Sequence, residues 1–514
     1  MKAKLLALPV ITALTLLASE VSAQRYQAEV FSNVNITTDV QYATNISVLS
    51  GSPAMVNLNM DIYEPAGDTA TQRPLIIFMH TGSYLPAYIN GTPTGSRNDS
   101  ATVEMCNQFA RRGYVVANMD YRLGWNPVSS SLDVRRGTLL QAVYRSIQDA
   151  KACVRWHRAE AAGANTYKID PNLIILGGQG TGGYIALNYA VLDKPSEINL
   201  QKFISSITVP GLYIAGQSYV LQDTLGDFDG YGGVPWWNNP NNTPGFPTNV
   251  QFVFNLGGAM GDSSWIEAGD APMVAMHVIG DPFAPYDSGI VYVPGTPPQA
   301  VVDVAGSRRV LKIANQLGNN NCFANNGFTD PYTQTANLSN EGFEGLFPFP
   351  TVPAVQAGPW EWVDSATVYN VAPLYGQNPT NIYYGFLQTN PANSKTRALA
   401  YIDSIMGYLN PRMCYCLGFC PPWSPTGLNP NAELASLVSI GPNPSAGNVD
   451  INLDQITQPV QSIELTDISG RVIRNFAIDT RKRYTVYRDD LNAGIYFVRL
   501  RFDSGEVNKK IILE

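Results

Sequence analysis

Histidine is scarce in this chain, which has only three among its 514 residues: His80, His157 and His277. Charged residues are also few, at 14%, and the net charge is −8, so a basic surface for binding nucleic acid is not expected. Beyond residues 1–23 no run of about 18 or more apolar residues occurs, and we therefore predict no transmembrane segment in the mature chain. Glycine (44) and tyrosine (27) are plentiful by contrast, and the length predicts at least two domains.

The amino terminus has the parts of a secretory signal peptide. Lys2 and Lys4 precede an apolar stretch at residues 5–17, and the small residues at 21–23 resemble a cleavage site. The apolar stretch is too short to span a bilayer. Residues 1–23 are therefore predicted to be a signal peptide that is removed on export.

All six cysteines lie beyond this segment, and an even number of cysteines in an exported chain favours disulfides. The last three have the spacing C-x-C-x₃-C, which is also compatible with zinc, but no histidine lies near them in the sequence. We predict disulfides, with no metal site and no cofactor. The candidates are Cys106, Cys153, Cys322, Cys414, Cys416 and Cys420.

A glycine-rich stretch in the first half of the chain carries the main chemical signal. Residues 173–187 begin as an apolar run, break into glycines and resume with apolar residues at helical spacing, which predicts a strand, a tight turn and a helix. The turn has the frame of a G-x-S-x-G nucleophile elbow, with Gly178 and Gly182 at the outer positions. The nucleophile position itself is Gly180, so the frame is present without a hydroxyl.

Two other interpretations of the same glycines remain open. Gly178, Gly180 and Gly183 match the G-x-G-x-x-G spacing of a dinucleotide-binding loop, although this stretch does not lie at the first strand of the domain. Alternatively, Thr181 is the nucleophile, with Gln179 then standing where the tight turn needs a small residue.

The segments before the elbow follow the order of a known family. An apolar strand at residues 74–79 ends in His80-Thr81-Gly82, and helices are predicted at residues 99–112 and 133–162 on either side of a strand with an Asp-Tyr-Arg turn. In this order and spacing the chain resembles an α/β-hydrolase of the secreted carboxylesterase and lipase type. The resemblance implies oxyanion-hole amides, which would come from Gly82, Ser83 and Thr181.

The remaining members of a catalytic triad are incomplete in the sequence. By the same resemblance, the strand and loop around residues 272–286 would carry the triad acid, which places that role on Asp281. Hydrolases of this type have the chain order nucleophile, acid, histidine, yet no histidine follows Asp281. We predict that His80, His157 and His277 are structural, so that Gly180 and Asp281 are vestigial triad positions.

An aromatic segment at residues 211–250 lies where such hydrolases insert lids. If its rings at Tyr231, Trp236 and Trp237 are exposed, they could stack on a sugar or aryl ligand. The alternative is a lid that packs on the body of the domain.

The last part of the chain differs sharply in composition. Residues 421–435 form a proline-rich linker, and twenty of the residues at 436–514 are charged. Strands with alternating polarity there predict a small β-sandwich. Four motifs in order, Gly-Pro-Asn-Pro, Asp-Ile-Ser-Gly-Arg, Leu-Asn-Ala-Gly-Ile-Tyr and Lys-Lys-Ile-Ile-Leu, resemble the type A C-terminal sorting domain of type IX secretion. That resemblance implies export across an outer membrane by the type IX machinery, often followed by removal of the tail.

Together these observations predict an α/β-hydrolase fold at residues 24–420, with a mostly parallel sheet and helices on both faces, followed by the β-sandwich. Two hypotheses for function follow. In the first, the exported protein lacks catalysis and serves as a binding or structural protein, with a surface glycan or a protein as partner. In the second, it is a carboxylic ester hydrolase with a non-standard catalytic group such as Thr181.

Overall fold

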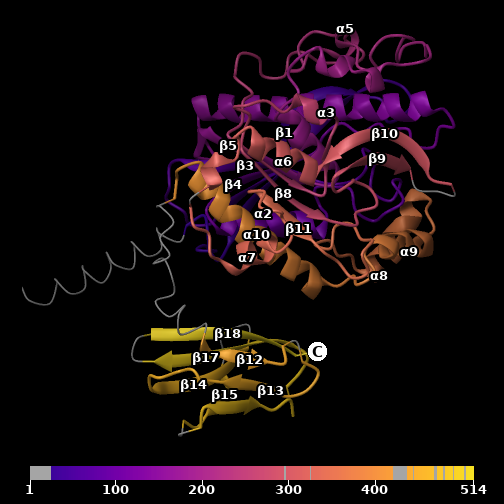
Figure 1. The fold of residues 1–514 in the computed structure, drawn as a ribbon. Helices are drawn as coiled ribbons and strands as arrows, with labels where there is room; N and C mark the ends of the chain where they lie inside the picture. The colour runs from indigo at the N-terminus through magenta and orange to yellow at the C-terminus, as the bar shows by residue number, and fades with distance from the viewer. Residues whose placement is uncertain are drawn as a thin grey trace, which may run out of the picture. The chain divides into compact units, whose positions relative to one another are not determined.

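The computed structural model divides into two compact units, one before and one after Pro422. It describes residues 25–293, 297–324, 326–420, 437–443, 445–467, 472–478, 481–489, 491–502 and 505–513. The expected signal peptide, the linker and part of the Asp-Ile-Ser-Gly turn lie outside the described residues. Figure 1 shows the chain, with the helices and strands labelled.

The first unit is built on an eight-stranded sheet with the order β1-β2-β4-β3-β5-β6-β8-β11. The first two strands pair antiparallel, and the others run parallel from β4 to β11. This strand order is that of the predicted α/β-hydrolase fold. The strands are β1 (Val34–Ser47), β2 (Ala54–Pro65), β3 (Arg73–Met79), β4 (Val115–Met119), β5 (Ile169–Gln179), β6 (Phe252–Leu256), β8 (Met273–Val278) and β11 (Leu346–Phe349).

Helices cover both faces of this sheet, because its central strands are apolar on both sides. All seven residues of β3 and all five of β4 are buried, which is typical of parallel strands covered by helices. One face packs against α3 (Leu132–Ala162) and α4 (Thr181–Tyr189), and the other against α2 (Ser100–Arg111) and α10 (Lys395–Cys416). The two helices predicted before the elbow are thus confirmed, within one residue at each end.

The sequence predicts a helix around residues 396–409, and helix α10 extends beyond that range at its carboxyl end. Proline lacks the amide hydrogen that an interior helix position needs, so a helix usually ends before one. The helix continues to Cys416 because the turn after the proline is buried, with Met413 and Cys414 in the core. The side chain of Asn410 donates to the carbonyl of Met406 at 2.8 Å and helps to satisfy the local backbone.

The shorter elements surround the carboxyl ends of the parallel strands or fill the loops between them. A small antiparallel sheet has the order β7-β10-β9. These elements are β7 (Ala259–Met260), β9 (Ser288–Val293), β10 (Gln299–Gly306), α5 (Gln222–Leu225), α6 (Ser307–Gln316), α7 (Pro331–Asn337), α8 (Ser365–Val371), α9 (Pro379–Thr389) and the 3₁₀ turns Glu197–Asn199, Gln201–Phe203, Ser263–Trp265, Asn321–Phe323 and Ala372–Tyr375.

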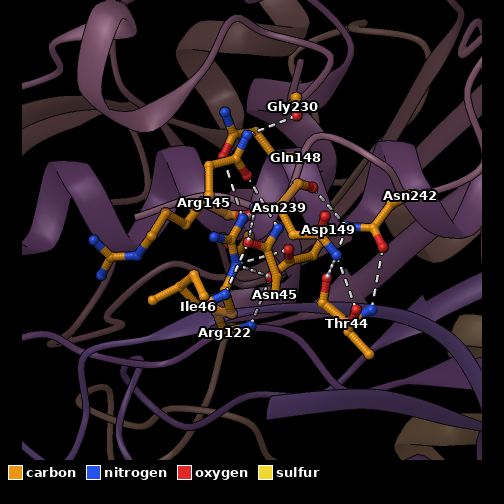
Figure 2. Close-up of polar contacts among 12 residues, drawn as sticks. Thr44, Asn45, Ile46, Arg122, Arg145, Gln148, Asp149, Gly230, Asn239 and Asn242 are labelled. Atoms are coloured by element: carbon orange, nitrogen blue, oxygen red, sulfur yellow. Dashed lines mark hydrogen bonds and ion pairs between the residues drawn. The ribbon is translucent and has the colours of Figure 1, made fainter. Parts of the chain in front are cut away.

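The Asp-Tyr-Arg turn after β4 is anchored on α3 by a buried ion pair. Nε of Arg122 lies 2.8 Å from Oδ1 of Asp149, and neither side chain is exposed. The main-chain amide of Arg122 donates to the other carboxylate oxygen, also at 2.8 Å, and Gln148 accepts a further bond from the guanidinium. Figure 2 shows these side chains converging between α3 and the loop. A carboxylate bonded in this way fixes both the side chain and the backbone of the turn.

The segment at residues 211–250 packs against α3 and β1. It therefore lies on the body of the domain, which is the second of the two arrangements expected for it. Asn239 Nδ2 donates to the Thr44 carbonyl at 3.0 Å, and Asn242 Nδ2 donates to the same carbonyl at 2.9 Å. Figure 2 shows both asparagines reaching β1 beside the Arg122 network. The amide of Gln148 on α3 also donates to the carbonyls of Leu225 and Asp227. These bonds hold the segment along the outer side of the helix.

Four of the six cysteines form disulfides, and the prediction of oxidised cysteines is wrong for the other two. Cys322 pairs with Cys416, and Cys414 pairs with Cys420. Cys106 and Cys153 are free and buried. They cannot meet because Cys106 lies in the core on one face of the sheet and Cys153 in the core on the other.

The second unit is the predicted β-sandwich. Two antiparallel sheets, with the orders β12-β13-β16 and β15-β14-β17-β18, enclose a core of aliphatic and aromatic side chains. The strands are β12 (Ser439–Gly441), β13 (Val449–Asn452), β14 (Val460–Asp467), β15 (Val472–Phe476), β16 (Arg483–Val486), β17 (Gly494–Phe502) and β18 (Gly505–Leu513).

Candidate functional site

The turn between β5 and α4 has the backbone of a nucleophile elbow. Gly180 adopts φ 51° and ψ −115°, outside the regions that residues with side chains prefer. The outer glycines are required by close packing: a Cβ on Gly182 would lie 2.1 Å from the carbonyl oxygen of Met79, and one on Gly178 would lie 2.6 Å from it. The elbow therefore forms at the end of the central strand β5, at the predicted residues.

The space above Gly180 is occupied by Thr81. A Cβ on Gly180 would lie 2.2 Å from Oγ1 of this threonine, which is far closer than any two non-bonded atoms approach. A serine at position 180 would therefore require the Thr81 side chain to move. The sequence shows that a nucleophile is missing there, and the structure adds that the Thr81 hydroxyl lies where its Cβ would be.

Three successive residues of the loop after β3 adopt positive φ values. Gly82, Ser83 and Tyr84 have φ values of 133°, 56° and 53°. The amide of Ser83 donates to Oγ1 of Thr181 at 2.7 Å, so the predicted residues do meet. The Ser83 amide is consequently bonded to a side chain, while Gly82 and Thr181 line the adjacent cavity.

Thr181, the alternative nucleophile, has its hydroxyl engaged by the loop. Besides the bond from Ser83, a side-chain hydrogen bond links it to Tyr121. The Tyr121 hydroxyl in turn donates to the carbonyl of His80 at 2.8 Å. Among the described residues no histidine ring contacts the Thr181 hydroxyl, so its proton has no imidazole acceptor of the kind a Ser or Thr nucleophile uses.

Asp281 lies at the end of β8, at the position predicted for the triad acid, and lines the same cavity as the elbow. Its side chain is 5% exposed. Oδ1 accepts bonds from the amides of Phe283, at 2.7 Å, and Ala284, at 3.0 Å. Burial nevertheless raises the pKa of this carboxyl to about 7 because water no longer solvates its charge.

The three histidines are buried, and none of them contacts a hydroxyl of the elbow in the described part of the chain, as a triad base would. His277 is bonded to the Ser307 hydroxyl at 2.6 Å and to the Ala284 carbonyl at 3.1 Å. His80 stacks on Tyr121, with ring centroids 4.6 Å apart. Burial lowers the pKa of His277 and of His80 to about 4, and that of His157 to about 3, so that all three are neutral at physiological pH.

Trp360 and Glu361, which sequence analysis did not single out, lie where the missing base would be expected. They follow β11, the last strand of the sheet, and line the cavity with Gly180 and Asp281. The indole Nε1 of Trp360 donates to Oε1 of Gln179 at 2.8 Å. Burial, together with the neighbouring carboxyls of Asp99 and Asp281, raises the pKa of Glu361 to about 8. No local pattern in the sequence marks these residues, because their role comes from long-range packing.

The cavity beside the elbow measures about 300 Å³, which is within the range of small-molecule sites. Its polar lining includes groups of the elbow together with Asp281 and Glu361. The rest of the lining is mainly apolar and comes from α3, the hairpin β9–β10 and the residues around α9. Its larger apolar side chains are Trp125, Leu139, Val143, Phe203, Trp265 and Val302.

The aromatic residues predicted to stack on a ligand lie away from this cavity. Within the segment at residues 211–250, only Val220 lines it. The guanidinium of Arg155 lies over the ring of Tyr231, 4.8 Å from the centroid. Trp237 packs on the core, and Trp236 is 63% exposed. The structure does not bring these rings together with the elbow.

Two protein families match different parts of the chain. Residues 60–208, which include β3 and the elbow, match the family model named BD-FAE. Residues 439–514 match the secretion system C-terminal sorting domain. The chain joins an esterase-like hydrolase region to a secretion sorting tail. The tail is that of type IX secretion, which delivers proteins to the outer membrane or the cell surface.

Solved esterases are similar to about half of this chain at low identity. Esterase 2 of Thermogutta terrifontis, phosphorylated by paraoxon, is 19% identical over 50% of this chain and 74% of its own, with a TM-score of 0.29. The same esterase with bound butyrate is 20% identical over 45% and 70%, with a TM-score of 0.28. Esterase B of Lactobacillus rhamnosis, inhibited by a tributyrin phosphonate, is 16% identical over 53% and 74%, with a TM-score of 0.29.

No curated protein matches the chain. In the part of the chain that the structure describes, none of the helices combines the length and the apolar character needed to span a bilayer.

Proposed function

We propose that the exported protein binds a small molecule in the cavity beside the elbow and does not hydrolyse esters through an acyl-enzyme. The observation that carries this proposal is the position of the Thr81 hydroxyl, 2.2 Å from where a Cβ of residue 180 would lie. A covalent route needs a hydroxyl at the elbow and a base to accept its proton. Here position 180 has no side chain, Thr81 fills the space, and the neutral His277 is bonded to Ser307 and Ala284.

The cavity supports a binding role in its own right. It combines a largely apolar lining with a few polar groups on one side, which is the usual composition of a ligand site. The sorting tail places this site outside the cell or on its surface, where ligands from the surroundings have access to it.

A second candidate function is carboxylic ester hydrolysis, which the match to BD-FAE favours. The carboxyls of Asp281 and Glu361 provide a route without a covalent intermediate. An ionised carboxylate would take a proton from a water molecule as that water attacks the ester carbonyl. Collapse of the tetrahedral intermediate would then break the bond to the alkoxide, which takes up the proton, and the products would be an acid and an alcohol.

The experiment that tests the proposal combines two measurements on the purified mature protein. Turnover is measured with short-chain aryl esters, and covalent labelling with a fluorophosphonate probe, using an active serine esterase as the positive control. The binding function predicts neither turnover nor labelling. Turnover without labelling, abolished by Asp281→Asn or Glu361→Gln, would establish the water route.

Turnover with labelling would contradict the proposal directly. In that case Thr181→Ala decides the nucleophile, since Thr181 is the only residue of the elbow turn at positions 178–182 with a hydroxyl. Loss of labelling in this variant would assign the role to Thr181, and retention would place the reactive group elsewhere.

A further inference from the structure

The ionisable side chains that line the cavity are acidic. Asp281 and Glu361 line it, and no lysine, arginine or histidine does so among the described residues. Most of the other lining groups are apolar or uncharged. An anionic ligand would therefore meet like charges without any basic partner, whereas a cation would be matched.

One oxygen of Asp281 is left for a ligand. Oδ1 accepts both of the printed backbone bonds, and Oδ2 accepts none from the described residues although the side chain is 95% buried. The nearest ring nitrogen, Nε2 of His277, is 3.9 Å away and bonds to the carbonyl of Ala284. Oδ2 is not among the fully buried polar atoms that lack a partner, so a donor group on a ligand in the cavity can reach it.

The free oxygen and an aromatic ring face the same place beside the elbow. A Cβ built on Gly257 would lie 3.3 Å from Oδ2 of Asp281 and 3.7 Å from the ring of Trp360. The hydrogen bond from Trp360 to Gln179 holds this ring in place. Glu361 is the next residue, and its side chain is bonded to Thr94. Carboxylates and an indole ring are side-chain groups that bind ammonium ions.

We propose that the ligand of this cavity is an organic ammonium ion with an apolar alkyl or aryl body. The ammonium group lies between the carboxyls of Asp281 and Glu361 and the ring of Trp360, and the body lies among the apolar side chains of α3 and the hairpin β9–β10. This inference rests on the binding function proposed above and adds the charge and chemical class of the ligand.

Binding of such a cation depends on pH in a definite direction. Protons compete with the ammonium ion for both carboxyls, whose pKa values lie at about 7 and about 8, so affinity rises between pH 6 and 9. Asp99, whose pKa burial raises to about 7, faces Glu361 and ionises in the same range. His277 and Tyr184 also face Asp281, but His277 stays neutral above about pH 5, and burial raises the pKa of Tyr184 well above its usual value.

Isothermal titration of the full mature chain at pH 8.5 with hexylamine, hexanol and hexanoate tests the inference. These probes share one apolar body and differ in the charge of the head. We expect hexylamine to bind about tenfold more tightly than hexanol, which corresponds to about 1.4 kcal/mol, and hexanoate to bind more weakly than either. In Asp281→Asn and Glu361→Gln the preference for the amine should fall by about tenfold, while binding of hexanol is retained.

Asp364→Asn is the matched control. Asp364 is a carboxylate three residues from Glu361 that caps α8 and does not line the cavity, and asparagine caps a helix equally well. It should leave all three affinities unchanged. Equal binding of hexylamine and hexanol, unaffected by either variant, would overturn the ammonium class while leaving the binding function intact. Absence of binding by all three probes would overturn both proposals.

Discussion

The indole nitrogen of Trp360 donates a hydrogen bond to the side chain of Gln179, the residue immediately before the vacant nucleophile position. The two residues are 181 positions apart in the sequence. Trp360 thereby ties the loop that follows the last strand of the sheet to the elbow. The loop places an indole and the carboxyl of the next residue, Glu361, in the lining of the cavity beside the elbow.

The position of the Thr81 hydroxyl beside Gly180 predicts the effect of placing a serine at the nucleophile position. Gly180→Ser should lower the free energy of unfolding by about 1–3 kcal/mol for two reasons. The new Cβ meets the Thr81 hydroxyl, and the serine must adopt a backbone conformation that is strained for any residue with a side chain. Thr81→Gly combined with Gly180→Ser should recover part of that loss. Urea denaturation measures both effects.

Gly67→Ser is the control for the backbone strain in this experiment. Gly67 has a φ of 77°, and a Cβ there would meet nothing within 4 Å. It should cost about 1 kcal/mol or less. If Gly180→Ser costs no more than Gly67→Ser, and Thr81→Gly gives no recovery, the steric account of the elbow is wrong.

The buried carboxyls predict that stability falls as pH rises. Asp281 and Glu361 have raised pKa values in the folded protein, so the folded state binds protons more tightly than the unfolded state. Below about pH 4 both carboxyls are protonated in the folded and the unfolded state, and their favourable contribution to the free energy of unfolding is fully present. It is lost as pH rises through the folded-state pKa values, about 7 for Asp281 and about 8 for Glu361. Between pH 5 and 8 the urea midpoint of Asp281→Asn and Glu361→Gln should therefore decrease less than that of the wild type. Parallel curves for all three proteins would refute the assignment.

The cysteines predict a simple count of thiols. Without reductant, the native protein should expose no reactive thiol, because Cys106 and Cys153 are buried. Denaturation alone should reveal two thiols, and denaturation with reductant six. Ellman's reagent provides the measurement. Any other number after denaturation alone would contradict the pairing of Cys322 with Cys416 and of Cys414 with Cys420.

The ion pair between Arg122 and Asp149 predicts a large loss of stability when one partner is removed. Asp149→Asn should destabilise the first unit by about 3–5 kcal/mol, since it leaves a buried guanidinium without its counter-charge. Asp287→Asn removes a carboxylate that is 48% exposed from its pair with Arg308 and should cost less than about 1 kcal/mol. Thermal or urea denaturation that gives similar losses for the two variants would contradict this difference.

The elbow could be predicted from the sequence because its signal is local. Gly178 and Gly182 are needed where the backbone passes within a side chain's width of Met79, and this requirement appears directly as glycine spacing. The location of Asp281 was also predictable, since it follows a strand with a recognisable pattern. These features depend on neighbours in sequence or on a strand order that the whole fold shares.

The remaining features depend on packing between distant segments. Nothing near Trp360 in the sequence indicates that its ring reaches Gln179. The spacing of the cysteines does not reveal that Cys106 and Cys153 lie on opposite faces of the sheet. The helix predicted around residues 396–409 stops short of Pro411, whereas tertiary packing continues α10 through this proline.

The two disulfides near the end of the first unit have a mechanical consequence. A pull applied to the chain beyond Pro422, for example by a tail held at the cell surface, reaches Cys420 first and passes through its bond to Cys414 inside α10. From the same end of that helix, Cys416 transfers load to Cys322 beside the sheet. The pulling force is therefore carried by the two disulfide bonds. It does not unfold α10 one turn at a time from its carboxyl end.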